Sequence, residues 1–155
     1  MPHAGKVLVA AVVLVIAAQF LWRRWRQAQQ RARRQLARLE FSELRESLQS
    51  EFLTAAAATG KPRGLSWKQC DLASGQLFAV DRVTGELYAF VGTTISFEAI
   101  PGGGMEDVDA VGNLRSATAV FVHRHGRWTT DGRVVFNLEP QEALVHFQES
   151  LRPED

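Results

Sequence analysis

The stretch GQLFAVDRVTGELYAFVG, residues 75–92, decides the fold class. Two runs rich in Leu, Phe, Val and Tyr flank the segment 82–85, which ends in glycine. This arrangement predicts two antiparallel strands joined by a tight turn. The next segment, TTISFEAI (93–100), continues the alternation and places Ile95, Phe97 and Ala99 on one side. The sequence therefore predicts a β-hairpin that belongs to an antiparallel sheet.

Three further segments have the composition of strands: LSWKQCDL (65–72), ATAVFVHR (117–124) and GRVVFNL (132–138). The turn signals HG (125–126) and TDG (130–132) separate the last two. The final segment, EPQEALVHFQESL (139–151), predicts a helix with Glu139 as its cap and Pro140 in its first turn. Its apolar stripe would lie on the sheet. We expect an α+β fold, in which residues 65–155 form a small antiparallel β domain of about six strands with a C-terminal covering helix.

The N-terminal part of the chain contains an uninterrupted apolar run, VLVAAVVLVIAA, from Val7 to Ala18, and FLW closes it at Trp22. At ~1.5 Å per residue, residues 7–22 span roughly 24 Å. Adding residues 4–6, with a snorkelling Lys6, approaches the ~30 Å of a hydrocarbon core. We therefore expect a membrane anchor in residues 1–22, with its span at about 4–22.

Two alternatives fit this apolar run less well. A cleaved signal peptide has a small-residue cleavage site after its apolar core, whereas RRWR follows here. A helix of a soluble protein fits less well still, because this run is apolar on every face. The aromatic residues Trp22 and Trp25 stand where interfacial anchors of a membrane span are expected.

Basic residues follow the apolar run directly. Residues 1–60 carry a net charge of +5 and residues 61–155 a net charge of −4, and seven arginines lie between positions 23 and 38 with no acidic residue among them. The positive-inside rule then predicts a single-pass protein of the inner (cytoplasmic) membrane, with the N-terminus outside and the C-terminal domain in the cytoplasm. The ratio of fifteen Arg to three Lys is typical of GC-rich bacterial genomes. We assign six residues to contact with membrane lipids rather than with nucleic acid: Arg23, Arg24, Arg26, Arg31, Arg33 and Arg34.

Residues 23–55 contain no Pro and no Gly, and they predict a helical stalk that continues the transmembrane helix. Apolar residues recur at spacings of mostly 3 and 4, but five positions separate Leu39 from Leu44. This break favours a solvated spacer over a homodimeric coiled coil, which stays as the alternative. Helix-stopping residues in the linker 56–64 predict a domain boundary, so a fragment starting near Lys61 would fold alone.

The segment FEAIPGGGMEDVDAVGN (97–113) raises the question of a binding site. We expect a mainly structural crossing, with a glycine bend and a short turn of helix that Gly112 ends. The alternative is a ligand or partner surface formed by Gly102, Gly103, Gly104, Glu106, Asp107 and Asp109. A calcium loop would need a third oxygen ligand where Val111 stands. A phosphate loop would need Lys and Ser or Thr after the glycines.

The candidate chemical groups elsewhere are few. His123 and His125 lie two apart on a predicted strand and would share a metal only with a third ligand, for which His146 is the candidate. Cys70 has no nucleophile signature around it and is expected to be a buried, inert thiol. We therefore assign no catalytic residue, no metal site and no cofactor.

The favoured function is a single-pass membrane protein that presents a small cytoplasmic interaction domain to an unidentified protein partner. The alternative is a membrane-tethered metal-binding or hydrolytic domain that uses the acidic loop 98–109 with His123 and His125. Convergence of these acids and histidines in one place would favour the alternative.

Overall fold

The computed structural model describes residues 3–59 and 63–154, with side chains described from Val12 onward within these ranges. The chain divides into two compact units, Met1–Leu36 and Ala37–Asp155. The described elements are three α-helices, a 3-10 helix and six strands, which confirms an α+β fold with a six-stranded antiparallel sheet.

The first unit consists of the larger part of helix α1 (His3–Glu43). Good helix formers dominate this segment, and it has no Pro. Large apolar side chains are exposed from Val12 to Trp25, among them Leu14 and Leu21. Within the described part of the chain, no helix combines the length and the apolar character that a membrane span needs. The anchor expected at residues 4–22 falls partly on residues 4–11, whose side chains lie outside the described ones.

The second unit is built on a sheet with the strand order β4-β3-β2-β1-β6, and β5 pairs with β3 as well. The long hairpin of β1 and β2 forms its middle, as residues 75–100 predict, and a bulge between Leu72 and Gln76 joins the first two expected strands into one. The strands are β1 (Leu65–Asp81), β2 (Leu87–Ala99), β3 (Arg115–Arg124), β4 (Arg127–Thr129), β5 (Val134–Phe136) and β6 (Leu151–Pro153).

The final helix is shorter than expected. Helix α3 (Pro140–His146) has the expected start, because Glu139 and Glu142 form a reciprocal capping box. It ends at His146, whereas the sequence predicted a helix to residue 151. Leu151 instead begins β6, which pairs with the end of β1 from Ala79 to Asp81. The backbone hydrogen bonds of this pairing take the place of a further helical turn.

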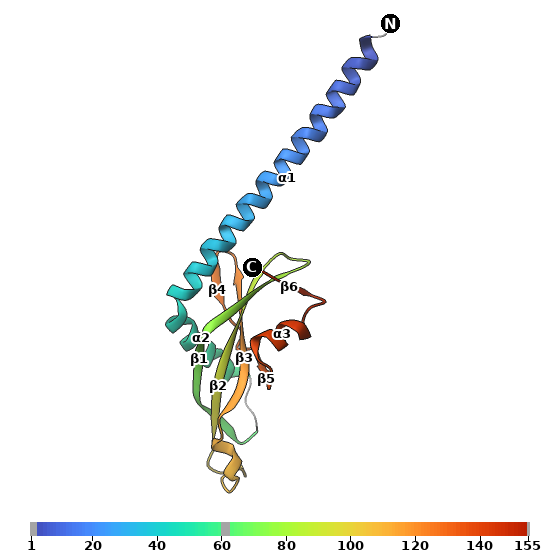
Figure 1. The fold of residues 1–155 in the computed structure, drawn as a ribbon. Helices are drawn as coiled ribbons and strands as arrows, with labels where there is room; N and C mark the ends of the chain where they lie inside the picture. Colours follow the sequence, from blue (N-terminus) through green and yellow to red (C-terminus); the bar gives the residue numbers. More distant parts are fainter. Residues whose placement is uncertain (1–2, 60–62, 155) are drawn as a thin grey trace. The chain divides into compact units, whose positions relative to one another are not determined.

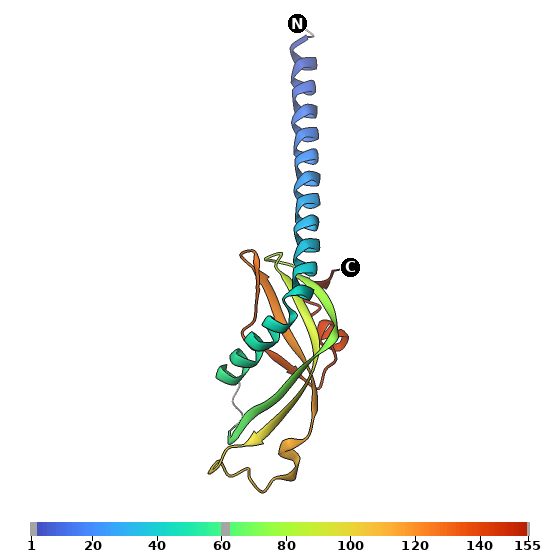
Figure 2. The same cartoon turned by 90° about the vertical axis from the view of Figure 1, so that its left-hand side faces the viewer.

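Helices cover both faces of the sheet, as Figures 1 and 2 show, with α2 (Arg45–Thr59) on one side and α3 on the other. The α3 face buries Phe90 and Val120 against Ala143. The opposite face buries Phe78 and Phe121 in the cluster that contains the helical residues Phe41, Leu48, Phe52 and Ala56. A strand buried on both faces needs apolar residues on both sides, which explains the apolar run from Leu87 to Val91 in β2.

The C-terminal half of the expected stalk packs on the sheet in the structure. Phe41 is fully buried and makes edge-to-face contacts with Phe78, Phe121 and Trp128 at centroid distances of 5.8, 5.4 and 4.8 Å. The indole N–H of Trp128 donates a buried hydrogen bond of 2.7 Å to the carbonyl of Ala37. The second compact unit therefore begins at Ala37, about twenty residues before the linker at 56–64.

A bend in the helix explains why the apolar spacing did not reveal this packing. Helix α1 ends at Glu43 and α2 begins at Arg45, and the bend is visible in Figure 2. A bend changes the direction in which the following side chains point. An apolar repeat that continues through the bend therefore lies on different faces of the two helices. The structure leaves Leu39 65% exposed, whereas Phe41, which lies off the expected stripe, is buried.

Two side chains of α2 also bond the outer edge of β1. The guanidinium of Arg45 donates to the carbonyl of Ala73, to the carbonyl of Ser74 at 2.9 Å, and to the side-chain oxygen of Gln76. The amide of Gln49 donates to the carbonyl of Cys70 at 2.9 Å. These bonds occupy edge carbonyls along a stretch of β1 that β6 does not reach.

Gly132 is where the loop after β4 touches α2. It has a φ of +76°, and an added Cβ would lie 2.3 Å from the backbone nitrogen of Ala56. Gly132→Ala is therefore expected to lower the free energy of unfolding of residues 37–155 by about 2–4 kcal/mol, measured by urea denaturation. Gly126 is the matched control, because it has a φ of +78° and an added Cβ would meet no atom within 4 Å. Gly126→Ala is expected to cost about 1 kcal/mol, and equal losses at the two positions would show that contact with α2 contributes nothing.

Candidate functional site

The glycine loop satisfies its own polar groups. Gly102 and Gly104 have φ values of +77° and +74°, so they form the expected bend. The Glu106 carboxylate accepts a hydrogen bond from the Gly102 N–H. Bonds from its own backbone N–H and from that of Gly102 lower the pKa of Glu106. The carboxylate thus closes the loop, a role that requires no ligand.

The second half of this loop forms the short turn of helix that we expected, but Gly112 does not have the expected conformation. A 3-10 helix, η1 (Asp109–Gly112), buries Val111. Gly112 is not among the glycines at positive φ, and an added Cβ there would meet no atom within 4 Å. Gly112 is therefore not a left-handed helix end, and the structure gives no conformational reason for glycine at this position.

The acidic loop and the histidines lie at opposite ends of the sheet. In the pairing of β2 with β3, Leu87 lies opposite His123 and Ile95 opposite Arg115. Eight residues of strand separate these two pairs, which corresponds to roughly 27 Å. The loop follows β2 beyond Ile95, so its acids do not converge with the histidines. Among the described residues, no group of three or more His, Cys, Asp and Glu side chains could hold a metal ion.

Each histidine has a local structural role. His123 stacks edge-to-face on Trp128 at 5.3 Å, and its Nε2 lies 3.9 Å from the Glu40 carboxylate. His125 has a φ of +51° and occupies the β3–β4 turn with Gly126, so it does not continue the strand on which His123 lies. The two imidazoles therefore do not form the pair that alternation along a strand would give.

Cys70 is buried beside Thr93, with 3.3 Å between the sulfur and the hydroxyl oxygen. Burial raises the pKa of its thiol, which disfavours the thiolate that nucleophilic chemistry needs. The expectation of a buried cysteine is confirmed.

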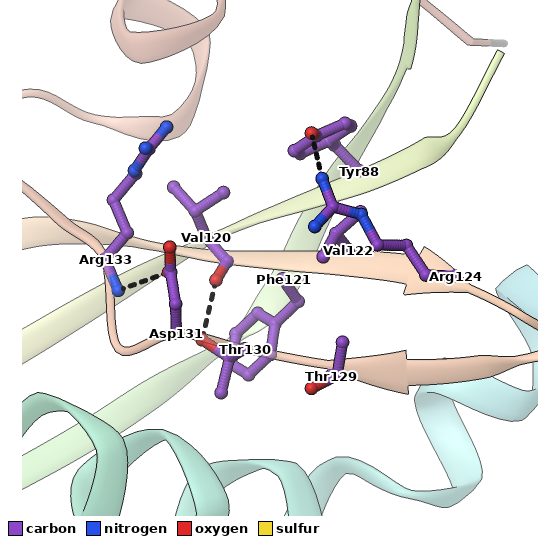
Figure 3. A pocket seen from close by; sticks show the side chains of 9 residues that line it. All are labelled: Tyr88, Val120, Phe121, Val122, Arg124, Thr129, Thr130, Asp131 and Arg133. Carbon is purple, nitrogen blue, oxygen red and sulfur yellow. Dashed lines mark hydrogen bonds between the residues drawn. The ribbon is translucent and has the colours of Figure 1, made fainter. Parts of the chain in front are cut away.

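A groove of about 240 Å³ lies on the α3 face of the sheet, near β4. Figure 3 shows Val120 and Tyr88 on the side of β3 away from α2, whereas Phe121 points toward α2. Arg124 and Arg133 flank this apolar surface from its two ends. The groove is open and small, so it accommodates one or two side chains rather than a whole small-molecule substrate.

The loop between β4 and β5 forms one wall of the groove. Thr130 leaves the sheet edge but stays attached to it, because its hydroxyl donates to the Val120 carbonyl at 2.9 Å. The same hydroxyl accepts a bond of 3.1 Å from the Gly132 N–H. The Asp131 carboxylate accepts the Arg133 N–H at 3.0 Å. The Val120 N–H also donates to the Arg133 carbonyl at 3.1 Å, so these bonds attach the loop to β3 and fix the backbone from which Arg133 extends.

The two arginines differ in their electrostatic surroundings. Arg124 donates to Glu86 at 2.8 Å and to the Tyr88 hydroxyl at 3.3 Å. The bond to Glu86 raises the pKa of the Arg124 guanidinium above its usual value. The exposed guanidinium of Arg133 has no ion-pair or hydrogen-bond partner within the described ranges (Figure 3). Arg133 is thus the group that is available to an anionic partner.

A second hollow of about 470 Å³ lies near the start of α3, beside Leu77, Gly92 and Pro140. This hollow exists because α3 is much shorter than the strand it covers. The seven residues of α3 extend over about 10 Å. The thirteen residues of β2 extend over roughly 44 Å. One short helix therefore leaves the sheet partly uncovered on either side of it.

The sequence carries no local signal of the groove. Its residues come from three separate strands and one loop, and nothing in the local pattern joins Tyr88 to Arg124 or Arg133. The six arginines assigned to lipids lie on α1, where Arg26 and Arg24 stack on Trp22 and Phe20 at 3.9 and 5.6 Å.

Comparison with known proteins gives no match: no family model fits the chain, and no curated protein and no solved structure matches it.

Proposed function

We propose that this chain is a single-pass protein of the cytoplasmic membrane that holds a small binding domain at the inner face. The observation that carries the proposal is an apolar helical segment followed by arginines. Val13, Leu14 and Ile16 are 57%, 69% and 60% exposed, and they point in different directions around the helix. Large apolar side chains exposed on all sides of a helix are unfavourable in water and favourable in lipid.

The charge pattern supports the orientation. Seven arginines follow the apolar segment and only Lys6 precedes it, which favours a cytoplasmic location for everything after Trp22. Basic residues close to an anionic leaflet contribute about 1 kcal/mol each to membrane association. The helix from Arg23 to Leu36 then serves as the spacer between the bilayer and the unit that begins at Ala37.

Membrane extraction tests the anchor. The full chain is expected to remain in the membrane pellet after carbonate washing, because a spanning helix is not released by breaking ionic contacts. A variant that lacks residues 4–22 but keeps all seven arginines is expected to be released. A reporter enzyme that works only in the cytoplasm should be active when it is fused to the C-terminus of the full chain. Release of the full chain, or protease access to its C-terminus from outside intact cells, would overturn the proposal.

The domain is proposed to bind an acidic segment of a protein partner in the groove of Figure 3. An apolar side chain of the partner would contact Val120 and Tyr88, and a carboxylate would pair with Arg133. Arginine recognises carboxylates through two parallel N–H bonds, which gives direction as well as affinity. The Thr130 hydroxyl and the Asp131 carboxylate in the groove bond the backbone, and its lining contains no Ser, Cys or His, which favours binding over hydrolysis.

Co-purification from detergent-solubilised membranes tests this site. Arg133→Glu is expected to reduce the bound partner at least about tenfold, because it places two carboxylates together. Arg152→Glu is the matched control, since Arg152 is also exposed but lies on β6 at the other edge of the sheet. Equal retention by the two variants would remove the groove from the proposal without affecting the anchor.

A further inference from the structure

We propose that α1 pairs in parallel with the α1 of a second copy of this chain, through a charge-free seam along residues 22–39. The seam has alternating spacings of 3 and 4 residues without interruption, which is the heptad pattern of two-stranded coiled coils. In heptad notation its a positions are Trp22, Gln29 and Leu36, and its d positions are Trp25, Ala32 and Leu39.

No arginine of this segment occupies a seam position, although the guanidinium of Arg26 stacks over the ring of Trp22 at 3.9 Å. None of the seven occupies an a, d or g position, and the g positions within the seam hold Ala28 and Gln35. The arginines lie at b, c, e and f: Arg23, Arg24, Arg26, Arg31, Arg33, Arg34 and Arg38. A helix that only met solvent or headgroups would have no reason to keep one side free of charge. The distribution thus separates a pairing side from a basic side.

The end of α1 that belongs to the second unit buries a different side of the helix from the seam. Leu36 and Leu39 are 67% and 65% exposed, whereas Ala37 and Phe41 are 3% and 0% exposed. At about 100° per residue, the centre of the Leu36–Leu39 pair lies about 150° around the helix from the centre of the Ala37–Phe41 pair. Within the second unit, the sheet therefore covers the side of the helix that carries Ala37 and Phe41 and leaves Leu39, the last seam residue, exposed.

The interruption of the apolar repeat does not oppose pairing. The spacing of five from Leu39 to Leu44 coincides with the end of α1 at Glu43. The seam ends near the end of α1, so the five-residue spacing sets the length of the seam and does not interrupt it. Gln29 at a central a position adds specificity, because a buried polar residue there favours one register.

The charges on the flanks fit a parallel pair. In that arrangement each e residue faces the g residue five positions earlier in the other copy. Arg26, Arg33 and Glu40 would then face Leu21, Ala28 and Gln35, so no like charges meet. The parallel direction rests on the proposed membrane anchor, since two chains that enter one membrane in the same orientation have parallel helices. Confinement to the membrane also raises the effective concentration for a short seam.

Cysteine cross-linking of the full chain in native membranes tests the seam. Leu36→Cys and Ala32→Cys introduce thiols at a and d, and Gln27→Cys and Gln30→Cys introduce them at f and b as controls. All four positions are exposed. A disulfide needs Cα atoms about 4.4–6.8 Å apart, which a paired seam provides and its outer side does not. The wild type serves as the blank because its only cysteine, Cys70, is buried.

We expect the dimer-sized product to form at least about tenfold faster at residues 32 and 36 than at residues 27 and 30. Leu36→Arg combined with Leu39→Arg should reduce cross-linking through Ala32→Cys at least about tenfold. Unchanged thermal melting would show that the fold is intact, since both leucines are exposed. Equal rates at all four positions, or cross-links only to a different protein, would overturn the proposal. If the chain cross-links but carbonate washing releases it from the membrane, the dimer stands and the membrane anchor is rejected. If the chain stays in the membrane but does not cross-link, only the dimer is rejected.

Discussion

A fragment of residues 37–155 is expected to fold on its own, and a fragment of residues 61–155 is expected to aggregate or stay unfolded. The shorter fragment lacks the helical segments that cover one face of the sheet, so Phe78, Phe121 and Trp128 would be exposed. Loss of a buried phenylalanine side chain costs about 3–5 kcal/mol. Phe41 and Phe52 together would thus cost a large share of the about 5–15 kcal/mol that stabilises an ordinary domain.

Circular dichroism melting and binding of a hydrophobic dye distinguish the two fragments. The longer fragment should unfold cooperatively and bind little dye, and the shorter one should show no cooperative transition. This expectation reverses the independent folding that the linker at 56–64 predicted from sequence. Cooperative unfolding of residues 61–155 would show that residues 37–59 are an accessory cover, although their side chains are buried.

Phe41→Ala is expected to lower the free energy of unfolding of residues 37–155 by about 3–5 kcal/mol, because it leaves a cavity between three aromatic rings. Urea denaturation with matched slopes measures the change. Phe136→Ala is the control, since Phe136 is 46% exposed on a three-residue edge strand. It is expected to cost about 1 kcal/mol. Similar losses for the two variants would contradict the packing of Phe41 as the centre of this core.

The sheet could be predicted because its signals are local. The hairpin around residues 82–85 and the turn at His125–Gly126 both occur where the sequence places them. The start of α3 follows from Glu139, Pro140 and Glu142, whose roles depend only on neighbouring residues. The covering role of residues 37–59 could not be predicted in this way. Their burial depends on a bend at Leu44 and on contacts with distant strands, and neither leaves a local pattern.

The site was less predictable than the fold. The glycines and acids of residues 102–109 attract attention as a cluster, yet Glu106 bonds the loop's own backbone. The groove combines Tyr88, Arg124 and Arg133, which come together only after β2, β3 and the β4–β5 loop are placed. The turn signal TDG predicts the β4–β5 loop, but it does not predict that Arg133, which follows it, flanks the groove.

The bonds from Arg45 and Gln49 to β1 have a consequence for solubility. A sheet edge with free carbonyls is a template on which strands of other molecules add, and long uncovered edges lead to fibrous aggregates. Here the guanidinium of Arg45 and the amide of Gln49 occupy the carbonyls of Cys70, Ala73 and Ser74, which an incoming strand would need. Helix α2 therefore completes the core and also protects the β1 edge from strand addition. A chain that loses α2 would be both less stable and more prone to aggregate.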